Sequence, residues 1–442
     1  MKTPIYDFVK SYAASGGSRF HMPGHKGNGP LGCEMLDITE IKGADVLCEA
    51  EGIIGESEDN ASRLFGTAHT FYSTEGSTLA IKAMLAIVCA GKERPLILAA
   101  RNAHKAFLCA AALLDLDIEW IYPEDFLHIT SCQITPSALD KAIKNASRAP
   151  SAVYITSPDY LGQTADVAAL ASVSHAHSLP LLVDNAHGAY LAFESPSSHP
   201  IVQGADMCCD SAHKTLPVLT GGAYLHISKN ADPEYLTRAR DAMALFSSTS
   251  PSYLVLQSLD LCNTYLEKDF ADELKLCSAR VKATKEKICS LGFTLLDSEP
   301  LKIVVNAAAS GYTGDELADI LREHGVECEF ADGEFLVLMA SPKNTEADFE
   351  RLERAFENIA PKAALPHSRD TLCRAEQKMS VRDAVLSSKE LIDVKLSSGR
   401  ICAELAISCP PAVPVAVCGE VITEDTVALL QKYGVEKIKV VK

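Results

Sequence analysis

A lysine follows a predicted strand in the stretch CCDSAHKTLPVLTGGAYLH, residues 208–226. Residues 205–210 form a short, mostly apolar run that predicts a buried strand. A lysine that is removed from water can have its pKa lowered by roughly 3–5 units when burial is complete. Such a lysine is a nucleophile that can hold an aldehyde as a Schiff base. The alternative is that Lys214 extends to solvent from the strand end, so other residues must support a catalytic role.

Hydroxyl-bearing residues precede a helical pattern in YSTEGSTLAIKAM, residues 72–84. Hydroxyl groups and a glycine at a helix N-terminus can bind phosphate, because backbone N–H groups and the helix dipole both favour an anion. Serine and threonine are also ordinary helix caps, so this signal is weak alone. The residues of this predicted cradle are Ser73, Thr74, Gly76, Ser77 and Thr78.

A phosphate cradle, an aspartate that ends one strand and a lysine that follows a later strand are the contacts that pyridoxal 5'-phosphate requires. Lys214 would bind the aldehyde, and Asp184 would keep the pyridine nitrogen protonated. His104 is placed to stack on the ring face. Ser211 or His213 could reach the phosphate or the bond to the lysine.

The elements that position these residues are short apolar segments that alternate with helical patterns. They predict an α/β fold with a mainly parallel central sheet covered by helices on both faces. Ligands bind such sheets at the carboxyl ends of the strands, and four predicted strands are followed there by polar, titratable residues. The predicted strands cover residues 95–100, 118–122, 152–157, 180–184, 205–210 and 222–228. Helices are predicted over residues 137–146 and 166–177.

Composition limits the class of protein. The chain has 442 residues, which predicts two or three packed units rather than one core. Its 47% hydrophobic and 22% charged residues are typical of a soluble globular protein. The apolar runs are shorter than the about 18 residues of a membrane span, and the N-terminus lacks a signal peptide, so we expect a cytoplasmic protein. A net charge of −17 argues against nucleic acid as a partner.

The 15 cysteines are scattered among apolar neighbours, so we expect reduced thiols. The sequence has no CxxC pair, and His175 and His177 lack further ligands at metal spacing. We therefore expect no metal site.

The sequence resembles the ornithine/lysine/arginine decarboxylase family of fold-type-I pyridoxal-phosphate enzymes, in its short form without an N-terminal receiver-like domain. The resemblance extends over most of residues 1–260, and the joint occurrence of SAHKTLP and DNAH is a specific signal. The matching segments are FHMPGHKG (20–27), DITEIKGADVL (37–47), LFGTAHTFYSTEGST (64–78), RNAHK (101–105), DNAHGAY (184–190), DSAHKTLPVLTGGAYLH (210–226) and SSTSPSYLVLQSLD (247–260).

The resemblance implies a role for each matching residue. Lys214 would be the Schiff-base lysine, Asp184 the pyridinium partner, His104 the stacking residue and His187 a neighbour of the cofactor oxygen. It further implies that Ser77, Thr78, Ser211 and His213 bind or flank the phosphate, and that Thr249 or Ser250 reaches the phosphate of the other subunit. Because the family builds its sites at a dimer interface, a homodimer or larger assembly is implied.

The implied reaction is decarboxylation of arginine, lysine or ornithine to the corresponding amine and carbon dioxide, in polyamine-related metabolism. Lys214 or His213 would return a proton to Cα. Glu404 is a candidate to bind a basic side chain, although a solvated strand residue is an equal alternative. Arg400 could instead hold the α-carboxylate and favour transamination. A decarboxylase of a non-basic amino acid and a non-catalytic binding protein are further alternatives.

Two departures from the family pattern bear on these roles. Asn185 stands where the family commonly has an acidic residue. In the C-terminal motif, residues 409–412 (CPPA) lack the usual tyrosine and glycine, and Cys418 replaces a usual proline. That region helps to shape the substrate pocket in relatives, so the second departure concerns substrate identity.

The sequence predicts four parts: an N-terminal arm (1–45), a cofactor-binding large domain (46–250), a small α/β domain (251–360) and a C-terminal decarboxylase-type domain (361–442). Within the small domain, strands are predicted over residues 301–307, 326–330 and 334–340. Helices are predicted over residues 313–325 and 345–360, and a linker over residues 360–370.

Overall fold

The computed structural model describes residues 1–124, 128–366, 370, 372, 374–407 and 413–442. The chain folds into two compact units. The first unit contains Met1–Glu93, Pro150–Ile155 and Val167–Ala271. The second unit contains Arg94–Ala149, Thr156–Asp166 and Asp272–Lys442. The four-part division predicted from the sequence stays a prediction.

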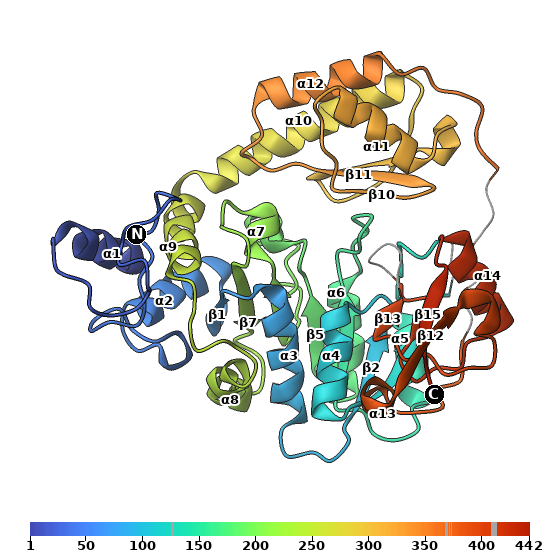
Figure 1. Cartoon of the computed structure of the whole chain (residues 1–442), viewed down its shortest axis with the longest axis horizontal. Coiled ribbons are helices and arrows are strands. Elements are labelled where there is room, and N and C mark those ends of the chain that lie inside the picture. The colour runs from blue at the N-terminus through green and yellow to red at the C-terminus, as the bar shows by residue number, and fades with distance from the viewer. Residues whose placement is uncertain (125–127, 367–369, 371, 373, 408–412) are drawn as a thin grey trace. The chain divides into compact units, whose positions relative to one another are not determined.

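Seven strands form the central sheet, in the order β1-β7-β6-β5-β4-β2-β3. Figure 1 labels β1, β7, β5 and β2 of this sheet. They are β1 (His69–Ser73), β2 (Leu96–Ala100), β3 (Asp117–Ile121), β4 (Ala152–Thr156), β5 (Leu181–Asp184), β6 (Met207–Asp210) and β7 (Ala223–Ile227). β5 pairs with β6, and β2 with β3, in parallel, whereas β7 pairs antiparallel with β1 and β6. The predicted α/β class with a mainly parallel central sheet is confirmed.

The strands that carry the predicted site are apolar on both faces. Every residue of β5 and β6 is buried, as is typical of strands in a sheet that helices cover on both sides. The helix α3 (Gly76–Cys89) packs against β6 and β7 and buries residues around most of its circumference. This packing, together with the contact between Ser77 and Ser211, places the carboxyl end of β6 next to the N-terminus of α3.

Besides β1, β5, β6, β7, most of β4 and the helix α3, the first unit contains further helices. They are α1 (Pro4–Ala14), η1 (Leu47–Glu49), α2 (Ile53–Phe65), α6 (Val167–Ala176), η2 (Ala189–Phe193), α7 (Ala212–Thr215), α8 (Pro233–Ala244) and α9 (Tyr253–Lys268). α2 contacts β1, and α3 contacts α8.

The second unit contains an antiparallel sheet of order β10-β11-β9-β8, formed by β8 (Thr294–Leu296), β9 (Lys302–Asn306), β10 (Phe330–Ala331) and β11 (Phe335–Met339). Two further antiparallel pairs join β12 (Lys389–Asp393) to β15 (Lys437–Val441), and β13 (Ala406–Ile407) to β14 (Ala416–Val417). Its other elements are α4 (Lys105–Leu114), α5 (Pro136–Lys144), most of α10 (Phe270–Ser290), η3 (Ala308–Ser310), α11 (Gly314–Glu323), α12 (Glu346–Glu357), α13 (Val381–Leu386), η4 (Val394–Leu396) and α14 (Glu424–Lys432).

The predicted strand over residues 326–330 is wrong except at Phe330, where β10 begins. Val326 instead takes part in the turn that ends α11, because its N–H donates to the carbonyl of Leu321. Gly325 has a positive φ of 74° and donates to the carbonyl of Arg322. This is a Schellman-type helix end, in which backbone groups that a strand would need satisfy the last helical carbonyls.

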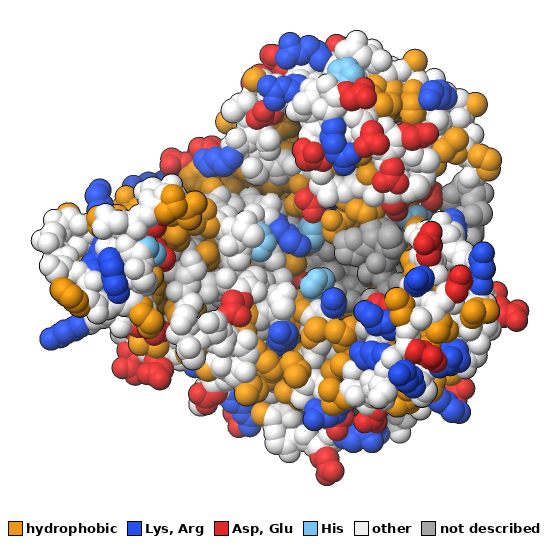
Figure 2. All heavy atoms as spheres, viewed as in Figure 1, with side chains coloured by type: hydrophobic (Ala, Val, Ile, Leu, Met, Phe, Trp, Pro, Cys, Tyr) orange, Lys and Arg blue, Asp and Glu red, His pale blue; other side chains and the backbone are white. Residues whose placement is uncertain are grey.

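No helix among the described residues is both long and apolar enough to cross a membrane. Each cysteine within the described ranges carries a free thiol. On the face shown in Figure 2, acidic and basic side chains are interspersed.

Candidate active site

Lys214 lies in the short helix α7, directly after β6. The sequence left burial and extension to solvent open for Lys214, and in the single chain this residue is exposed. The reason is that α7 leaves the sheet at its carboxyl edge and buries Ala212 and Thr215 instead. Nζ of Lys214 lies 3.0 Å from Nε2 of His187. Because an ammonium group only donates, Nε2 of His187 is the acceptor.

Asp184 is the last residue of β5 and is buried. The hydroxyl of Tyr154 donates to its Oδ2 at 3.2 Å, and the N–H of Ala186 donates to its Oδ1 at 3.2 Å. β5 and β6 are parallel neighbours in which Asp184 pairs with Cys209. The carboxylate and Lys214 therefore emerge from adjacent strand ends.

The predicted phosphate cradle lies at the N-terminus of α3. Ser73 donates its hydroxyl to the carbonyl of Gly76 at 2.9 Å and accepts from the N–H of Glu75 at 3.1 Å. The buried hydroxyl of Ser77 accepts from Ser211, at 2.8 Å between the two oxygens. This contact joins the cradle directly to the loop that carries Lys214. Thr74 is half-buried and Thr78 is exposed in the same turn.

Gly221 lets two backbone segments approach each other at the cradle. Its carbonyl accepts from the N–H of Gly76 at 2.7 Å. Its φ is +98°, a conformation that residues with a side chain rarely adopt. A Cβ atom at this position would lie 2.7 Å from the carbonyl oxygen of Thr74. The close packing of the cradle therefore depends on glycine at position 221.

His213 is oriented by the backbone. Its Nδ1 lies 2.9 Å from the carbonyl oxygen of Gly222 and donates to it, because a carbonyl can only accept. Nε2 is therefore the atom of His213 that is available to exchange a proton.

The segment with Thr249 and Ser250 is tied to the cradle within the same unit. The N–H of Ser248 donates to Oε1 of Glu75 at 2.6 Å, and Ser250 donates its N–H to the hydroxyl of Ser248 at 3.1 Å. Thr249 and Ser250 are exposed in the single chain. Their role toward another subunit stays a prediction.

Three predicted site residues belong to the second unit. His104 is the N-cap of α4, where its Nδ1 accepts from the N–H of Ala106 at 3.2 Å. Arg400 forms an ion pair with Glu390 and donates to the carbonyl of Val441 at 2.8 Å. Oε1 of Glu404 accepts from the N–H of Lys439 at 3.0 Å. The altered motif at residues 409–412 lies outside the described residues.

A buried carboxylate beside the site was not predicted as functional from the sequence. Asp210 ends β6 and is fully buried. Its Oδ1 accepts from Nδ2 of Asn185 at 2.6 Å, and its Oδ2 accepts from Nε2 of His199 and Nε2 of His226, each at 3.0 Å. Burial alone would raise the pKa of Asp210, but the two histidines outweigh it and hold this pKa well below its ordinary value. The sequence did contain a signal for a role of Asp210 at the site, because Asp210 ends its predicted strand in the same way as Asp184 does.

The ligand-type atoms of His199, Cys208 and Asp210 lie within 4.8 Å of one another. Both imidazoles are engaged in hydrogen bonds, because Nδ1 of His226 lies 2.9 Å from the Thr70 hydroxyl and Nδ1 of His199 accepts from the N–H of Ile201 at 3.4 Å. Burial, reinforced by the charge of Asp210, raises the pKa of the Cys208 thiol and disfavours the thiolate. These contacts describe a hydrogen-bonded network.

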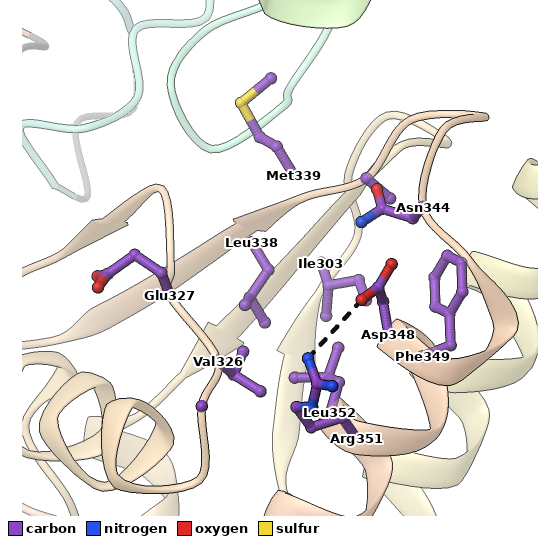
Figure 3. A pocket seen from close by; sticks show the side chains of 12 residues that line it. Ile303, Val326, Glu327, Leu338, Met339, Asn344, Asp348, Phe349, Arg351 and Leu352 are labelled. Atoms are coloured by element: carbon purple, nitrogen blue, oxygen red, sulfur yellow. Dashed lines mark ion pairs between the residues drawn. The ribbon is translucent and has the colours of Figure 1, made fainter.

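A cavity of about 200 Å³ lies in the second unit, against β9, β11 and α12 (Figure 3). Apolar side chains, including Ile303, Leu338 and Phe349, contribute to its lining. Asp348 and Arg351 come from the same helix and form an ion pair at 3.8 Å. The predicted site residues are not among the residues that line this cavity.

The residues of the first unit fit pyridoxal 5'-phosphate. A helix N-terminus with a hydroxyl pair and a backbone turn that only glycine allows suits a phosphate group. A lysine and a carboxylate at adjacent strand ends suit the aldehyde and the ring nitrogen.

The chain belongs to the Orn/Lys/Arg decarboxylase family, since the model of the major domain of this family matches residues 3–306. The family and the names of the chain's relatives make it an amino acid decarboxylase, a lyase.

Two relatives illustrate how far the similarity extends. Arginine decarboxylase of Bacillus subtilis (strain 168) is 29% identical over 462 aligned residues, which cover 98% of this chain and 93% of the relative. The uncharacterized protein YaaO of the same strain is 30% identical over 98% of this chain and 94% of its own length.

Solved structures show the same fold. The lysine decarboxylase of Francisella novicida has a TM-score of 0.82 at 17% identity, covering 100% of this chain and 81% of that chain. The constitutive lysine decarboxylase of E. coli has a TM-score of 0.81 at 17% identity, covering 100% of this chain and 82% of that chain. The fold is thus shared with lysine decarboxylases and, more distantly, with other fold-type-I pyridoxal-phosphate enzymes.

Proposed function

We propose that this chain uses pyridoxal 5'-phosphate to decarboxylate arginine, lysine or ornithine, yielding the corresponding amine and carbon dioxide for polyamine-related metabolism. The observation that carries the proposal is the arrangement of Lys214 and Asp184 at adjacent strand ends, next to the cradle of α3. The similarity to arginine and lysine decarboxylases supports a basic substrate.

Pyridoxal phosphate, when bound, would supply an electron sink that weakens the bonds at Cα of an amino acid. Lys214 would hold its aldehyde carbon, and Asp184 would keep its ring nitrogen protonated. Ser77 and Ser211 would bind its phosphate together with the N–H groups at the start of α3. His104 would stack on its ring.

Two groups of the first unit could move the proton that replaces carbon dioxide at Cα. Lys214 Nζ is hydrogen-bonded to Nε2 of His187 at 3.0 Å, so His187 can orient the amine and exchange a proton with it. His213 presents Nε2 because its Nδ1 is held by the carbonyl of Gly222. We propose Lys214 or His213 as the donor to Cα.

The substrate side chain would be selected by a carboxylate, for which Glu404 is the candidate. Its Oε1 already accepts from the N–H of Lys439, which fixes the carboxylate and leaves Oε2 for a basic group. Arg400 is paired with Glu390 and with the carbonyl of Val441, contacts that disfavour a role in holding the α-carboxylate for transamination.

We further propose that the enzyme acts in the cytoplasm as a homodimer or larger assembly. Thr249 or Ser250 would then reach the phosphate of the other subunit. Neither nucleic acid nor a membrane is proposed as a partner.

The test combines an absorbance spectrum with a reaction assay on the full chain. We expect a near-visible absorption band that is absent in Lys214→Ala and retained in Lys229→Ala, which alters an exposed lysine of the same unit. Carbon dioxide release is then measured with each basic amino acid and without an oxo acid.

Each outcome separates the proposal from its alternatives. Release from one basic amino acid supports the proposed reaction. A band with turnover only in the presence of an oxo acid would indicate an aminotransferase, and release from a non-basic amino acid alone would contradict the proposed substrate class. Absence of the band after addition of pyridoxal phosphate would favour a non-catalytic binding protein.

A further inference from the structure

A buried side-chain pair joins the two loops that form the proposed site. Asp210 ends β6 immediately before Ser211, and Asn185 follows Asp184 at the end of β5. Nδ2 of Asn185 donates to Oδ1 of Asp210 at 2.6 Å, and both residues are fully buried. The N–H of Asn185 also donates to the carbonyl of Cys209 at 3.0 Å. The loops are therefore joined through both backbone and side chain.

The carboxylate of Asp210 fixes which way the amide of Asn185 points. A carboxylate only accepts, so the amide nitrogen must face Asp210 and the amide oxygen must point away. That oxygen packs against Gly188, where a Cβ atom would lie 2.1 Å from it. The N–H of Gly188 donates to the backbone carbonyl of Asn185 at 2.8 Å and closes a tight turn. His187, the partner of Lys214, lies within this turn.

The other oxygen of Asp210 is held from the opposite side. Nε2 of His199 and Nε2 of His226 each donate to Oδ2 at 3.0 Å. Nδ1 of His226 accepts in turn from the hydroxyl of Thr70, at 2.9 Å. Both histidines are fully buried. Together with Nδ2 of Asn185 they give the carboxylate three hydrogen-bond donors, which fix its position. Replacement of one of its two oxygens by a donor group would leave a buried donor without an acceptor, which costs about 1–3 kcal/mol.

We propose that Asp210 and Asn185 are a positioning pair for the proposed site. The pair holds the turn of residues 185–188 in the one geometry that brings His187 to Lys214. This inference rests on the proposed function, because it assigns the pair a role toward the cofactor-binding lysine. Asn185 stands where the family commonly has an acidic residue, and in this chain the buried carboxylate of the pair is that of Asp210.

The reciprocal exchange Asn185→Asp/Asp210→Asn tests the pair. In this double variant the new amide at position 210 donates to the new carboxylate at position 185. The amide oxygen at position 210 still accepts from both histidines, so each hydrogen bond keeps an acceptor. Each single variant breaks the pattern. Asn185→Asp brings two carboxylates together. In Asp210→Asn two amide nitrogens meet, and turning over the Asn185 amide restores this contact only by pointing its N–H donors at Gly188, where its oxygen now lies.

Thr70→Val is the matched control. It removes the hydrogen bonds of the Thr70 hydroxyl with His226 and Thr67, at the far end of the same buried network, and leaves the contact between Asp210 and Asn185 intact. For all variants, the thermal midpoint of the cofactor-free protein is compared with the dissociation constant of pyridoxal phosphate from an absorbance titration. Values of kcat and KM are measured separately.

We expect Asp210→Asn to weaken cofactor binding about tenfold, as loss of one buried hydrogen bond implies. Thr70→Val lowers the thermal midpoint but leaves the dissociation constant near the wild-type value. The reciprocal exchange returns the dissociation constant to near the wild-type value.

Two results would overturn the positioning role. If Asp210→Asn and Thr70→Val weaken cofactor binding in proportion to their loss of stability, the pair only stabilises the fold. If the reciprocal exchange restores the thermal midpoint but not cofactor binding, the hydrogen bond between positions 185 and 210 does not position the site for the cofactor. Failure of the wild-type protein to bind pyridoxal phosphate is a different result, which contradicts the proposed function and the positioning role with it.

Discussion

Arg101 and Glu420 form a buried ion pair although 319 positions separate them in the chain. Nη2 of Arg101 lies 2.9 Å from Oε2 of Glu420, and Nε and Nη2 also donate to the carbonyl of Pro414 at 3.3 and 3.2 Å. The guanidinium stacks on Trp120, 4.9 Å from the ring centre. Within the second unit, the C-terminal segment is thus anchored to the loop that leads to His104.

Removal of one charge from this pair should be strongly destabilising. We expect Glu420→Gln to lower the free energy of unfolding by about 3 kcal/mol, because it leaves the Arg101 guanidinium buried without a counter-ion. Glu390→Gln is the control, since it breaks the partly exposed pair with Arg400 and should cost less than about 1 kcal/mol. Chemical denaturation of the three proteins measures the difference. Equal losses for the two variants would contradict this account of the pair.

Substitution of Gly221 should disturb the phosphate cradle. In Gly221→Ala the new Cβ atom would lie 2.7 Å from the carbonyl oxygen of Thr74, so the cradle must shift and cofactor affinity should fall. Gly66→Ala is a matched control, because Gly66 also has a positive φ, 69°, but no atom lies within 4 Å of the added Cβ. Both variants should lose about 1 kcal/mol of stability from backbone strain. An absorbance titration in which both bind pyridoxal phosphate like the wild type would refute the assignment of the cradle.

The stability of the first unit should depend on the protonation of Asp260. Burial raises the pKa of Asp260 to about 6 from an ordinary value of 3.8. The folded state therefore binds a proton at Asp260 more tightly than the unfolded state does. Protonation of Asp260 stabilises the fold fully below about pH 4, and this stabilisation is lost as the pH rises through about 6. Asp260→Asn cannot titrate, so its stability relative to the wild type should improve across this window by up to about 3 kcal/mol.

Thermal midpoints of both proteins at pH 4, 5, 6 and 7 measure this effect. The asparagine can still accept from the N–H groups of Ile5 and Tyr6, which donate to Asp260 Oδ2 at 2.9 Å each. A constant difference between the two proteins across this pH range would show that Asp260 does not titrate there.

Glu404→Gln should impair recognition of a basic substrate more than the reaction itself. The amide keeps an acceptor for the N–H of Lys439 but loses the negative charge. We expect KM for the basic amino acid to rise about tenfold while kcat changes less, because charge-assisted hydrogen bonds are roughly twice as strong as neutral ones. Steady-state kinetics with the preferred substrate provide the measurement. An unchanged KM would indicate that Glu404 only orders the backbone near β15.

Local patterns predicted the sheet and the candidate residues at its edge better than they predicted the environment of those residues. The strand that ends at Asp184 and the one that ends at Asp210 were recognisable from short apolar runs. The exposure of Lys214 was not, because it depends on how the four-residue α7 turns away from the sheet. Period and composition carry no information about such a turn.

Long-range polar contacts could not be predicted from local sequence patterns either. The hydrogen bonds of Asp210 to His199 and His226 require the register of β6 against β7 and the path of the chain before β6. The pairing of Arg101 with Glu420 depends on a return of the chain after 319 positions. Each residue alone reads as an ordinary charged or polar side chain.

The interleaving of the two units has a consequence for how this polypeptide can be made and divided. Each unit is assembled from three separate stretches, and the short stretches Pro150–Ile155 and Thr156–Asp166 fall between longer ones. A continuous fragment that contains either unit must therefore carry part of the other. During synthesis, neither unit can be complete before segments of both units have been made. We accordingly expect slow, non-local folding of the whole chain, and truncations that yield incomplete cores rather than independent domains.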